Sequence, residues 1–364
     1  MLKIDMLPAG YGDCLWIEFG DEAEPRRILI DGGIAPTFNT LRARIEELPE
    51  GERHFELLII THVDADHIEG VIRLLGSAKS LGISFGDLWF NGWKHLDEPD
   101  KLGGVQGEFL SALIEKEGHP WNKAFGGSAV VVPDEGPLPE RRFADGLTLT
   151  LLSPTPERLK KLVPKWNKEV QAAGLDRDSI DDVLAALEAN RKLRPEDDVL
   201  GDKTINIEKL GNSRFSGDSA EANGSTIAVL AEHNGKSCLL TGDAWSPVLA
   251  GSIQRLLDDR GIEKLKVDAL KVPHHGSRAN ISTDLLDKLR CRRFLFSTNG
   301  KIFHHPDLEG VARVISHGGK RPSLYFNYRT EFNEMWDDKN LMEGDYPYTT
   351  KYPEEEAGGI TVEL

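Results

Sequence analysis

The segment His62-Val63-Asp64-Ala65-Asp66-His67 constrains this chain most, because it places four potential metal ligands within six residues. Neither a helix nor a strand can direct four such side chains to one place, whereas a loop can. Imidazole nitrogen combined with carboxylate oxygen suits hard or borderline divalent cations. We expect the adjacent pair Asp66-His67 to diverge and serve one metal, while His62 and Asp64 serve another. The alternative is a polar helix start capped by Asp64 or Asp66, with incidental histidines.

This segment lies where a buried strand is expected to pass through a loop into a helix. Residues 55–60 form a continuous apolar run, typical of a strand buried on both faces, and residues 71–75 continue in helical rhythm. A helix is also expected over residues 37–48. The other predicted strands are 3–7, 15–19, 27–30, 225–231, 237–240, 269–272 and 293–297. Most of them are followed by polar, glycine-containing residues, and functional sites of layered α/β proteins usually lie at such strand ends.

The histidines gather at the ends of these predicted strands. Six of the eleven histidines in the chain do so, at positions 62, 67, 274, 275, 304 and 305. A lone histidine is usually exposed or a satisfied core residue, whereas imidazoles along one edge of a sheet are what a catalytic metal site needs.

Two segments stand apart from this strand-and-turn pattern. Residues 154–219 are charged and helix-prone, and we interpret them as a helical insertion in a hydrolase domain spanning residues 1–330. Its Trp166, Arg191, Lys192 and Arg194 could select a substrate or a protein partner, although a solvated pair of charged helices explains them as well. Residues 331–364 are predicted as a polar C-terminal extension, in which residues 359–364 could return as an edge strand.

Composition limits the function classes. The 44 basic and 60 acidic side chains give a net charge of −16. A negative net charge repels nucleic acid, although bound metal ions would cancel part of it. No apolar run approaches bilayer-spanning length and no leader segment is evident, so we expect a cytoplasmic protein without a membrane partner. The three cysteines are far apart and are expected to be reduced.

Several motifs in order resemble the metallo-β-lactamase superfamily, and more closely the branch that contains the hydrolase domain of the DNA-uptake protein ComEC. They are GYGDCLWI, ILIDGG, THVDADHIEG, NGSTIAVL, LLTGDA, KVPHHGS and HHPD. The resemblance runs from about residue 3 to residue 323 and skips the insertion. It implies an α/β protein with a four-layered αββα sandwich, whose metals lie at the rim between the two sheets.

The resemblance also implies roles for individual residues. His62 and Asp64 would bind the first metal, Asp66, His67 and His274 would bind the second, and Asp243 would bridge them. Asp31 would support the site from behind the ligands, although a turn residue in Asp-Gly-Gly is nearly as good a local explanation. His275 and Asp13 would support the loop or contact substrate. His305 would donate a proton or bind a phosphate, with His304 as the alternative.

The chain departs from the commonest superfamily motif, HxHxDH, by having Asp64 in place of the second histidine. This carboxylate makes Mn²⁺ more competitive with Zn²⁺ for the two expected divalent sites. No separate histidine between His67 and Asp243 clearly completes the first metal site, and His95 is the one candidate we weigh.

Two close cations activate water and neutralise charge on the oxygen under attack, so hydrolysis by a metal-bound hydroxide is expected. Phosphodiesters suit such a centre, with the Asp66 or Asp64 carboxylate assisting and His305 as acid. DNA or RNA is the leading substrate class. The alternatives are a hydrolase of small esters, lactones or cyclic nucleotides, and a metal-bearing module that binds a partner with weak catalysis.

Overall fold

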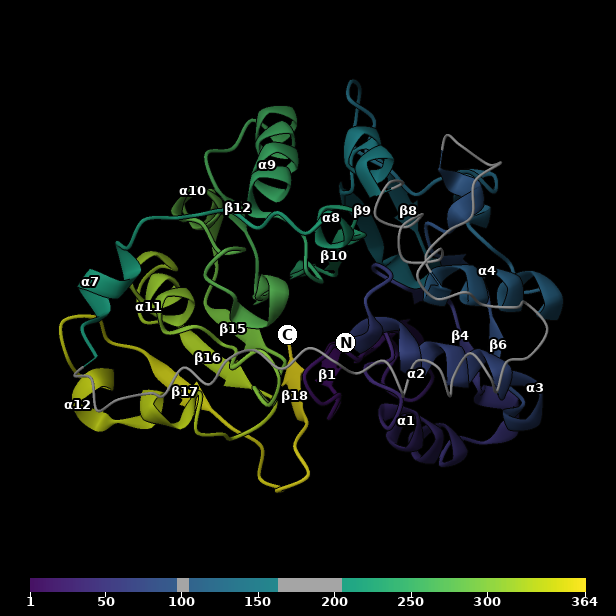
Figure 1. Cartoon of the computed structure of the whole chain (residues 1–364), viewed down its shortest axis with the longest axis horizontal. Coiled ribbons are helices and arrows are strands. Elements are labelled where there is room, and N and C mark those ends of the chain that lie inside the picture. Colours follow the sequence, from purple (N-terminus) through teal and green to yellow (C-terminus); the bar gives the residue numbers. More distant parts are fainter. Residues whose placement is uncertain (97–104, 163–204) are drawn as a thin grey trace.

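The computed structural model describes residues 1–96, 105–162 and 205–364. Its main features are two large sheets, of six and eight strands, that lie face to face with helices on both outer sides (Figure 1). The expected α/β class and four-layered αββα arrangement are therefore confirmed.

The first sheet has the strand order β18-β1-β2-β3-β5-β7. Its strands are β1 (Leu2–Met6), β2 (Leu15–Gly20), β3 (Pro25–Ile30), β5 (Leu57–Ile59), β7 (Leu88–Trp89) and β18 (Ile360–Glu363). β1, β2 and β3 are antiparallel, whereas β5 lies parallel to both β3 and β7. The helices that cover its outer face are α1 (Thr37–Glu46), α2 (Ala65–Gly76), α3 (Ala78–Leu81) and α4 (Val105–Glu117). A small neighbouring sheet joins β4 (His54–Phe55) to β6 (Ser84–Phe85).

The second sheet has the order β17-β16-β15-β13-β11-β10-β9-β8. Its strands are β8 (Glu140–Arg142), β9 (Thr148–Ser153), β10 (Ala228–His233), β11 (Lys236–Leu240), β13 (Ala269–Lys271), β15 (Arg293–Phe296), β16 (Ser323–Phe326) and β17 (Thr349–Lys351). From β11 to β17 the neighbours are parallel. Helices α9 (Ser246–Arg260), α10 (Thr283–Asp287) and α11 (Leu308–His317) cover its outer face, and β12 (Leu265–Lys266) pairs with β14 (Leu289–Arg290) at its edge.

Three hydrophobic clusters separate the four layers. One lies between the first sheet and its helices, one lies between the second sheet and its helices, and the third fills the space between the sheets. β5 shows how the sequence produces this arrangement, because Leu58 belongs to the outer cluster while Leu57 and Ile59 belong to the central one. Its continuous apolar run is thus the mark of a strand buried on both faces, as predicted.

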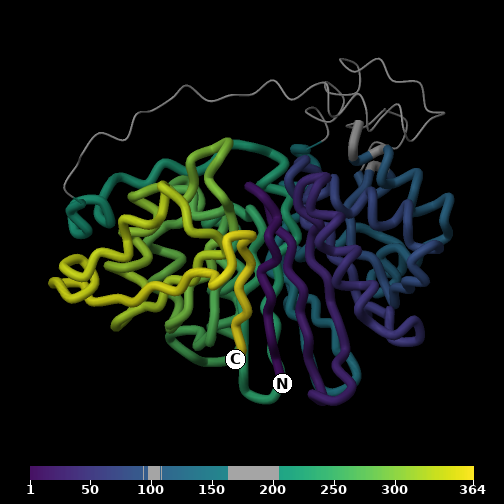
Figure 2. Tube along the Cα trace, turned by 90° about the horizontal axis from the view of Figure 1, so that it is seen from below, coloured from purple at the N-terminus to yellow at the C-terminus, as the bar shows by residue number. Residues whose placement is uncertain are grey.

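The C-terminal segment is part of both sheets. Residues 331–364, which the sequence suggests are a polar extension, supply β17 to the second sheet and β18 to the first. β18 pairs antiparallel with β1, so the two ends of the chain lie side by side (Figure 2), and the suggested edge strand is confirmed. Trp336 and Tyr348 are buried in the second outer cluster, and the Tyr348 hydroxyl donates to the Trp336 carbonyl oxygen over 2.9 Å. Two buried aromatic anchors hold a segment whose average composition is polar.

The predicted helical insertion is described only at its ends. Residues 156–162 are helical, and α7 (Ile207–Gly211) packs against α11. Trp166, Arg191, Lys192 and Arg194 lie outside the described residues. Within the described parts of the chain, no helix combines the length and the apolar character that crossing a membrane requires.

Trp336→Ala should lower the free energy of unfolding by about 3–5 kcal/mol, because it leaves a cavity in a fully buried position. Denaturant unfolding followed by fluorescence and circular dichroism would measure this change. Lys339→Ala, at an exposed position nearby, is the matched control and should be nearly neutral. A neutral effect of Trp336→Ala would show that residues 331–364 are a detachable extension.

Candidate metal centre

The candidate site lies at the edge where parallel strands of both large sheets end. In the first sheet, β3 leads to Asp31 and β5 leads to His62. In the second sheet, β11 leads to Asp243, and β13 leads to His274 and His275. Because the carboxyl ends of parallel strands meet at one edge of a sheet, these loops converge. Each half of the sandwich therefore supplies part of the site.

The beginning of α2 delivers the rest of the motif. Asp64 occupies the N-cap position with extended backbone (φ −72°, ψ 144°), and Asp66 and His67 follow in the first helical turn. The Asp64 side chain makes no capping hydrogen bond to the helix. A helix-capping aspartate accepts a hydrogen bond from a backbone amide of the first turn. Asp64 makes no such bond, so the alternative that it serves only as a helix cap is not supported.

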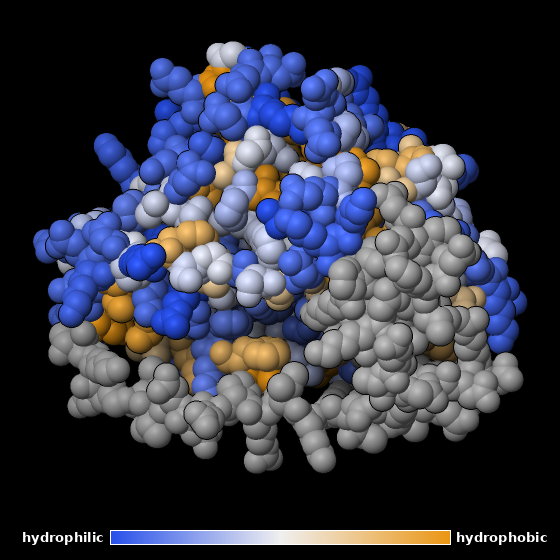
Figure 3. Space-filling view, turned by 45° about the horizontal axis from the view of Figure 1, so that its top comes forward, coloured by the Kyte–Doolittle hydropathy of each residue, from blue (hydrophilic) through white to orange (hydrophobic). Residues whose placement is uncertain are grey.

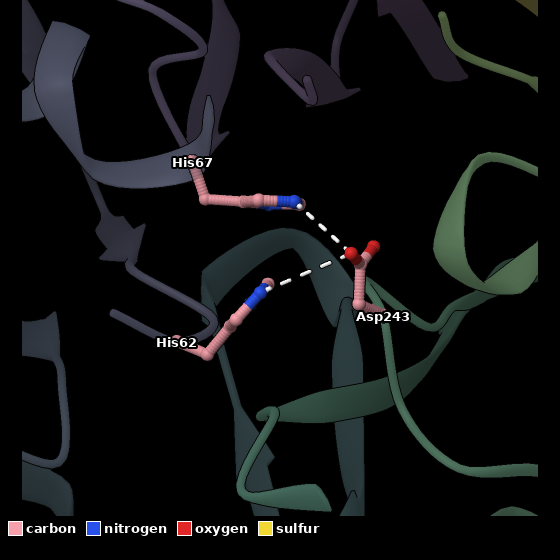
Figure 4. Close-up of side chains that lie close together, drawn as sticks. All are labelled: His62, His67 and Asp243. Carbon is pink, nitrogen blue, oxygen red and sulfur yellow. Dashed lines mark ion pairs between the residues drawn. The ribbon is translucent and has the colours of Figure 1, made fainter. Parts of the chain in front are cut away.

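His62, His67 and Asp243 form the centre of the site (Figure 4). The Nε2 atoms of His67 and His62 lie 3.4 Å and 3.9 Å from Oδ2 of Asp243. The two imidazole centroids are 4.2 Å apart, and both rings point toward the carboxylate. His62 Nε2 also lies 3.6 Å from Oδ2 of Asp64.

A second group overlaps the first. His275 Nε2 lies 3.4 Å from Asp66 Oδ2 and 3.6 Å from Asp243 Oδ2, while His67 Nε2 lies 3.9 Å from the same Asp66 oxygen. Asp66, His67 and His275 offer ligand atoms that all lie within 4.8 Å of one another, as do His62, His67 and Asp243. Both groups have the spacing that a metal ion requires.

Unpaired buried atoms show that these residues fit a metal. The Nε2 atoms of His62, His67 and His275, together with Asp243 Oδ1, are buried and have no hydrogen-bond partner among the residues that the structure describes. Buried polar atoms are otherwise almost always paired, so atoms of this kind that face one another call for a ligand. Imidazole and carboxylate donors in this arrangement match a divalent transition metal.

The opposite nitrogen of each imidazole is fixed by a partner. His67 Nδ1 donates to Asp31 Oδ2 over 2.8 Å, and Asp31 in turn accepts from the Thr61 amide and hydroxyl over 2.8 Å and 2.7 Å. His275 Nδ1 donates to the carbonyl oxygen of Ser297 over 2.8 Å, and His62 Nδ1 lies 3.0 Å from the Thr61 hydroxyl. These contacts direct the Nε2 atoms into the site. Asp31 is placed where a supporting residue was expected.

The structure distinguishes the two neighbouring histidines of the β13 loop. The resemblance assigns His274 as the ligand, but the buried groups contain His275, whose side chain is 1% exposed against 24% for His274. Both residues have positive φ (47° and 54°), and their ring planes are inclined by 71° with centroids 5.8 Å apart. His274 Nε2 still lies 3.7 Å from Asp243 Oδ2, and its Nδ1 lies 2.9 Å from Asn280 Oδ1. His274 thus faces the same carboxylate from the rim.

The remaining candidate histidines lie in different surroundings. His305 borders the site, with its ring 5.3 Å from that of His274 and its Nδ1 3.2 Å from Asp307 Oδ1. His304 stacks on Phe332 instead, at 4.8 Å between ring centroids. His95 accepts from the Gly92 amide at Nδ1 and contacts Asn122 through Nε2, so its ring nitrogens are engaged in its own loop. Neither His95 nor His304 belongs to a metal-binding group among the described residues.

A buried ion pair lies behind the site. Lys271 and Asp13 are 0% and 1% exposed and contact each other directly, and Asp13 Oδ1 lies 3.4 Å from His275 Nδ1. The residue before Asp13, Gly12, packs directly against the backbone at the start of α2, since a Cβ on Gly12 would lie 1.7 Å from the Asp66 carbonyl oxygen. The lysine compensates a carboxylate that would otherwise be buried alone beside the acidic ligands.

Electrostatics in this cluster are dominated by burial and by the carboxylates. Burial opposes protonation, but Asp243 and Asp13 raise the pKa of His275 to about 10, and Asp243 and Asp31 raise the pKa of His67 well above its ordinary value. Burial would raise the pKa of Asp243, but the surrounding histidines hold it well below the usual range. Burial lowers the pKa of His305, and Asp307 offsets this only in part.

Several supporting residues are not evident from the sequence patterns: Lys271, Thr61, Ser297, Asp218 and Asn280. Lys271 leaves one signal, since it is a lysine inside the otherwise apolar predicted strand 269–272. Asp218 accepts from Asn280 Nδ2 over 3.0 Å, and its Oδ2 lies 3.6 Å from His274 Nδ1. It comes from the end of the predicted insertion, and no local motif connects that segment to the site.

Comparison with known proteins gives only remote similarity. No protein-family model matches the chain, and no curated protein matches it. Among solved structures, the metallo-β-lactamase fold protein YhfI from Bacillus subtilis is similar at 10% identity over 99% of this chain and 98% of its own, with a TM-score of 0.44. A diphosphatase from the PhnP family is 12% identical over 100% of this chain and 98% of its own, with a TM-score of 0.36.

CmlA, a diiron β-hydroxylase from Streptomyces venezuelae, is 12% identical over 100% of this chain and has a TM-score of 0.39. This chain spans about half of CmlA, covering 54% of its length. At such identities and scores, none of these likenesses indicates which metal or which reaction applies to this chain.

Metal uptake by metal-free protein should release protons, because cations displace protons from histidines whose pKa values the carboxylates raise. The pH dependence of metal affinity follows from these raised pKa values. His275, with a pKa of about 10, is protonated at pH 7.5 and must lose that proton to bind metal, so metal affinity should fall as the pH falls. Calorimetry of Zn²⁺ or Mn²⁺ binding in buffers of different ionisation enthalpy measures the protons released. Binding without proton release, and with equal affinity at pH 7 and 9, would contradict this assignment.

Lys271→Met should lower the free energy of unfolding by about 3–5 kcal/mol, because it leaves Asp13 charged and buried without its partner. Adding Asp13→Asn should recover part of this loss, since the double variant has no uncompensated charge. Urea unfolding of both single variants, the double variant and the exposed control Lys264→Met completes the cycle. Strictly additive losses in the double variant would show that the two side chains do not interact.

Proposed function

We propose that this chain is a two-metal hydrolase of the metallo-β-lactamase superfamily and that it cleaves phosphodiester bonds. The observation that carries the proposal is the convergence of three buried, unpaired imidazole Nε2 atoms, those of His62, His67 and His275, around the Asp243 carboxylate. A purely structural cluster would pair these atoms with one another or with hydrogen-bond donors. The order of motifs along the sequence, from THVDADHIEG to KVPHHGS, supports the same superfamily.

The ligands divide into two sets that share Asp243. Asp66, His67 and His275 would hold one cation, and the short separations among their ligand atoms favour this set. His62 and Asp64 would hold the other. His274 is the best candidate to complete this second set, because its Nε2 faces the shared carboxylate from the rim. This assignment would supply the histidine that no sequence position between His67 and Asp243 clearly provides.

Two divalent cations held in this way would lower the pKa of a water molecule and neutralise the charge that develops on a phosphoryl group. The residues of the chain position the ligands and handle protons. Asp31 keeps the His67 Nδ1 proton in place, and Asp307 orients His305 through Nδ1. His305 Nε2 is then the atom that exchanges a proton with the substrate or its leaving oxygen.

The rim of the site favours a substrate with a planar ring. Phe303 is 44% exposed, which is unusual for a large apolar side chain. It packs edge-to-face with Tyr11 at 6.0 Å and lies nearly parallel to the His305 ring at 6.2 Å. An aromatic surface beside a phosphate-cleaving centre suits a nucleobase, because every base can stack on such a face. We therefore place nucleic acids and nucleotides first among phosphodiesters.

The net charge of −16 favours a second candidate, a hydrolase of small substrates such as cyclic nucleotides, esters or lactones. A small substrate needs no extended cationic track. A third candidate, a metal-bearing module that binds a partner, depends on the insertion, most of which lies outside the described residues.

Purified protein loaded with Mn²⁺ or Zn²⁺ should cleave a bis-nitrophenyl phosphate reporter and at least one of single-stranded DNA, duplex DNA, RNA or a cyclic nucleotide. His67→Ala should reduce kcat/KM by more than about 100-fold, because loss of an outer-shell partner alone typically costs 10- to 100-fold. His304→Ala is the matched control, since that ring stacks on Phe332 outside the metal-binding groups, and should retain full activity. Metal content is measured on each variant.

The outcomes separate the candidates. Cleavage of an ester or lactone reporter with no phosphodiester turnover favours the small-substrate hydrolase. Stoichiometric metal with no turnover on any substrate removes the phosphodiesterase proposal and leaves the binding module. Equal losses in His67→Ala and His304→Ala would mean that the proposed cluster is not the catalytic centre.

A further inference from the structure

A second concave site lies at the opposite edge of the second sheet. It is a cavity of about 560 Å³ bordered by the amino ends of β13, β15 and β16 and by the small sheet β12–β14. In this sheet the ligand-bearing loops of the candidate metal centre follow the carboxyl ends of β11 and β13, so the cavity and the metal centre are separated by the length of β13. The cavity is therefore distinct from the metal centre.

Basic side chains dominate this cavity. Lys266, Arg290, Arg292 and Arg293 line it against a single acid, Asp268. Across the described parts of the chain, none of these four cations forms a salt bridge, whereas arginines elsewhere such as Arg26 and Arg260 do. Asp268 is itself engaged, since its Oδ2 accepts from the Ser237 amide over 2.9 Å. Four uncompensated positive charges thus face one space on a chain whose net charge is −16.

Strand pairing holds these charges together. Lys266 lies directly opposite Arg290 in the parallel pair β12–β14, and Arg293 lies opposite Ser323 in the pair β15–β16. Like charges placed opposite each other across two strands destabilise a sheet. This placement has a cost in the free protein that a bound anion would remove.

Neutral donors complete the lining. The Ser323 hydroxyl accepts from Thr349 Oγ1 over 2.8 Å, which leaves its own hydrogen available to a ligand in the cavity. Tyr325 also borders the cavity, and its hydroxyl has no hydrogen-bond partner among the described residues. Guanidinium groups and hydroxyls that converge on one space form the donor set that recognises phosphate oxygens.

We propose that this cavity binds a small polyanion carrying at least two phosphate groups, as in pyrophosphate or a nucleoside diphosphate. Its volume of about 560 Å³ lies within the range typical of small-ligand sites. The cations surround the space from separate strand ends, a geometry that suits a compact anion better than a nucleic-acid strand crossing the surface. This inference does not depend on the proposed hydrolase activity.

Isothermal titration of the full, metal-loaded chain with pyrophosphate tests the site when the unaltered chain is compared with a cavity variant, because any binding at the metal centre is common to both. The double variant Arg290→Glu/Arg292→Glu changes two exposed positions and should weaken pyrophosphate binding by at least about tenfold, since it removes two charge-assisted contacts and adds two negative charges. The control Lys116→Glu/Lys160→Glu makes the same change in charge at exposed positions outside the cavity and should bind as the unaltered chain does. Bis-nitrophenyl phosphate turnover without pyrophosphate should be the same in both variants.

Parallel titrations identify the source of the phosphate groups. Binding of ADP that depends on Arg290 and Arg292 would extend the site to nucleotides, whereas pyrophosphate binding without ADP binding would restrict it to inorganic anions, and both outcomes support the proposal. Equal pyrophosphate affinity in the cavity variant and the unaltered chain would overturn it. Preference for an oligonucleotide without a terminal phosphate would also overturn it, because the cations would then form part of a nucleic-acid track.

Discussion

The buried carboxylate of Asp243 is the point on which the site depends. It lies 3% exposed between the two sheets, where an isolated negative charge would be costly, and imidazoles from both halves of the chain face it. His67 comes from α2 on the first sheet, and His275 comes from the loop after β13 on the second. The site is therefore complete only when the two sheets pack together.

A layer of supporting contacts converts this convergence into a rigid geometry. Asp31 fixes His67, and Ser297 fixes His275, each by a hydrogen bond to Nδ1. Close backbone approaches bring the loops within reach of one another. Gly32 and Gly70 pack so closely that a Cβ on Gly70 would lie 1.9 Å from the Gly32 carbonyl oxygen. The positions of the candidate ligands thus depend on these supporting contacts as well.

The parallel strands of the second sheet also explain why the molecule has two chemically different edges. β13 begins beside Asp268, at the cationic cavity, and ends at Lys271, which pairs with Asp13 behind the metal centre. β15 begins at Arg293 and leads to Ser297. Strands that all run in one direction gather their amino ends at one edge and their carboxyl ends at the other, so short strands separate the edge that carries the candidate metal centre from a basic edge.

By itself, the sequence determined the strands, the α/β class and the positions where chemistry gathers, because these follow from local periodicity and from the polar residues that end each strand. It identified His62, Asp64, Asp66 and His67 through their close spacing, although the structure places Asp66 and His67 in the first turn of α2 rather than in a loop. Tertiary structure alone decided that His275 rather than His274 enters the buried groups, because the contacts that hold the ring come from another strand end, such as the Ser297 carbonyl oxygen that accepts from His275 Nδ1.

Tertiary structure also decided where three features lie that local sequence patterns describe poorly. Residues 331–364 join both sheets because Trp336 and Tyr348 anchor them, although their average composition is polar. His95 and His304 lie outside the metal-binding groups of the described residues, since His95 contacts Asn122 and His304 stacks on Phe332. Lys271 is buried because Asp13, far away in the sequence, supplies its charge partner. Such pairings depend on which distant segments come into contact in the fold, and local sequence patterns do not predict these contacts.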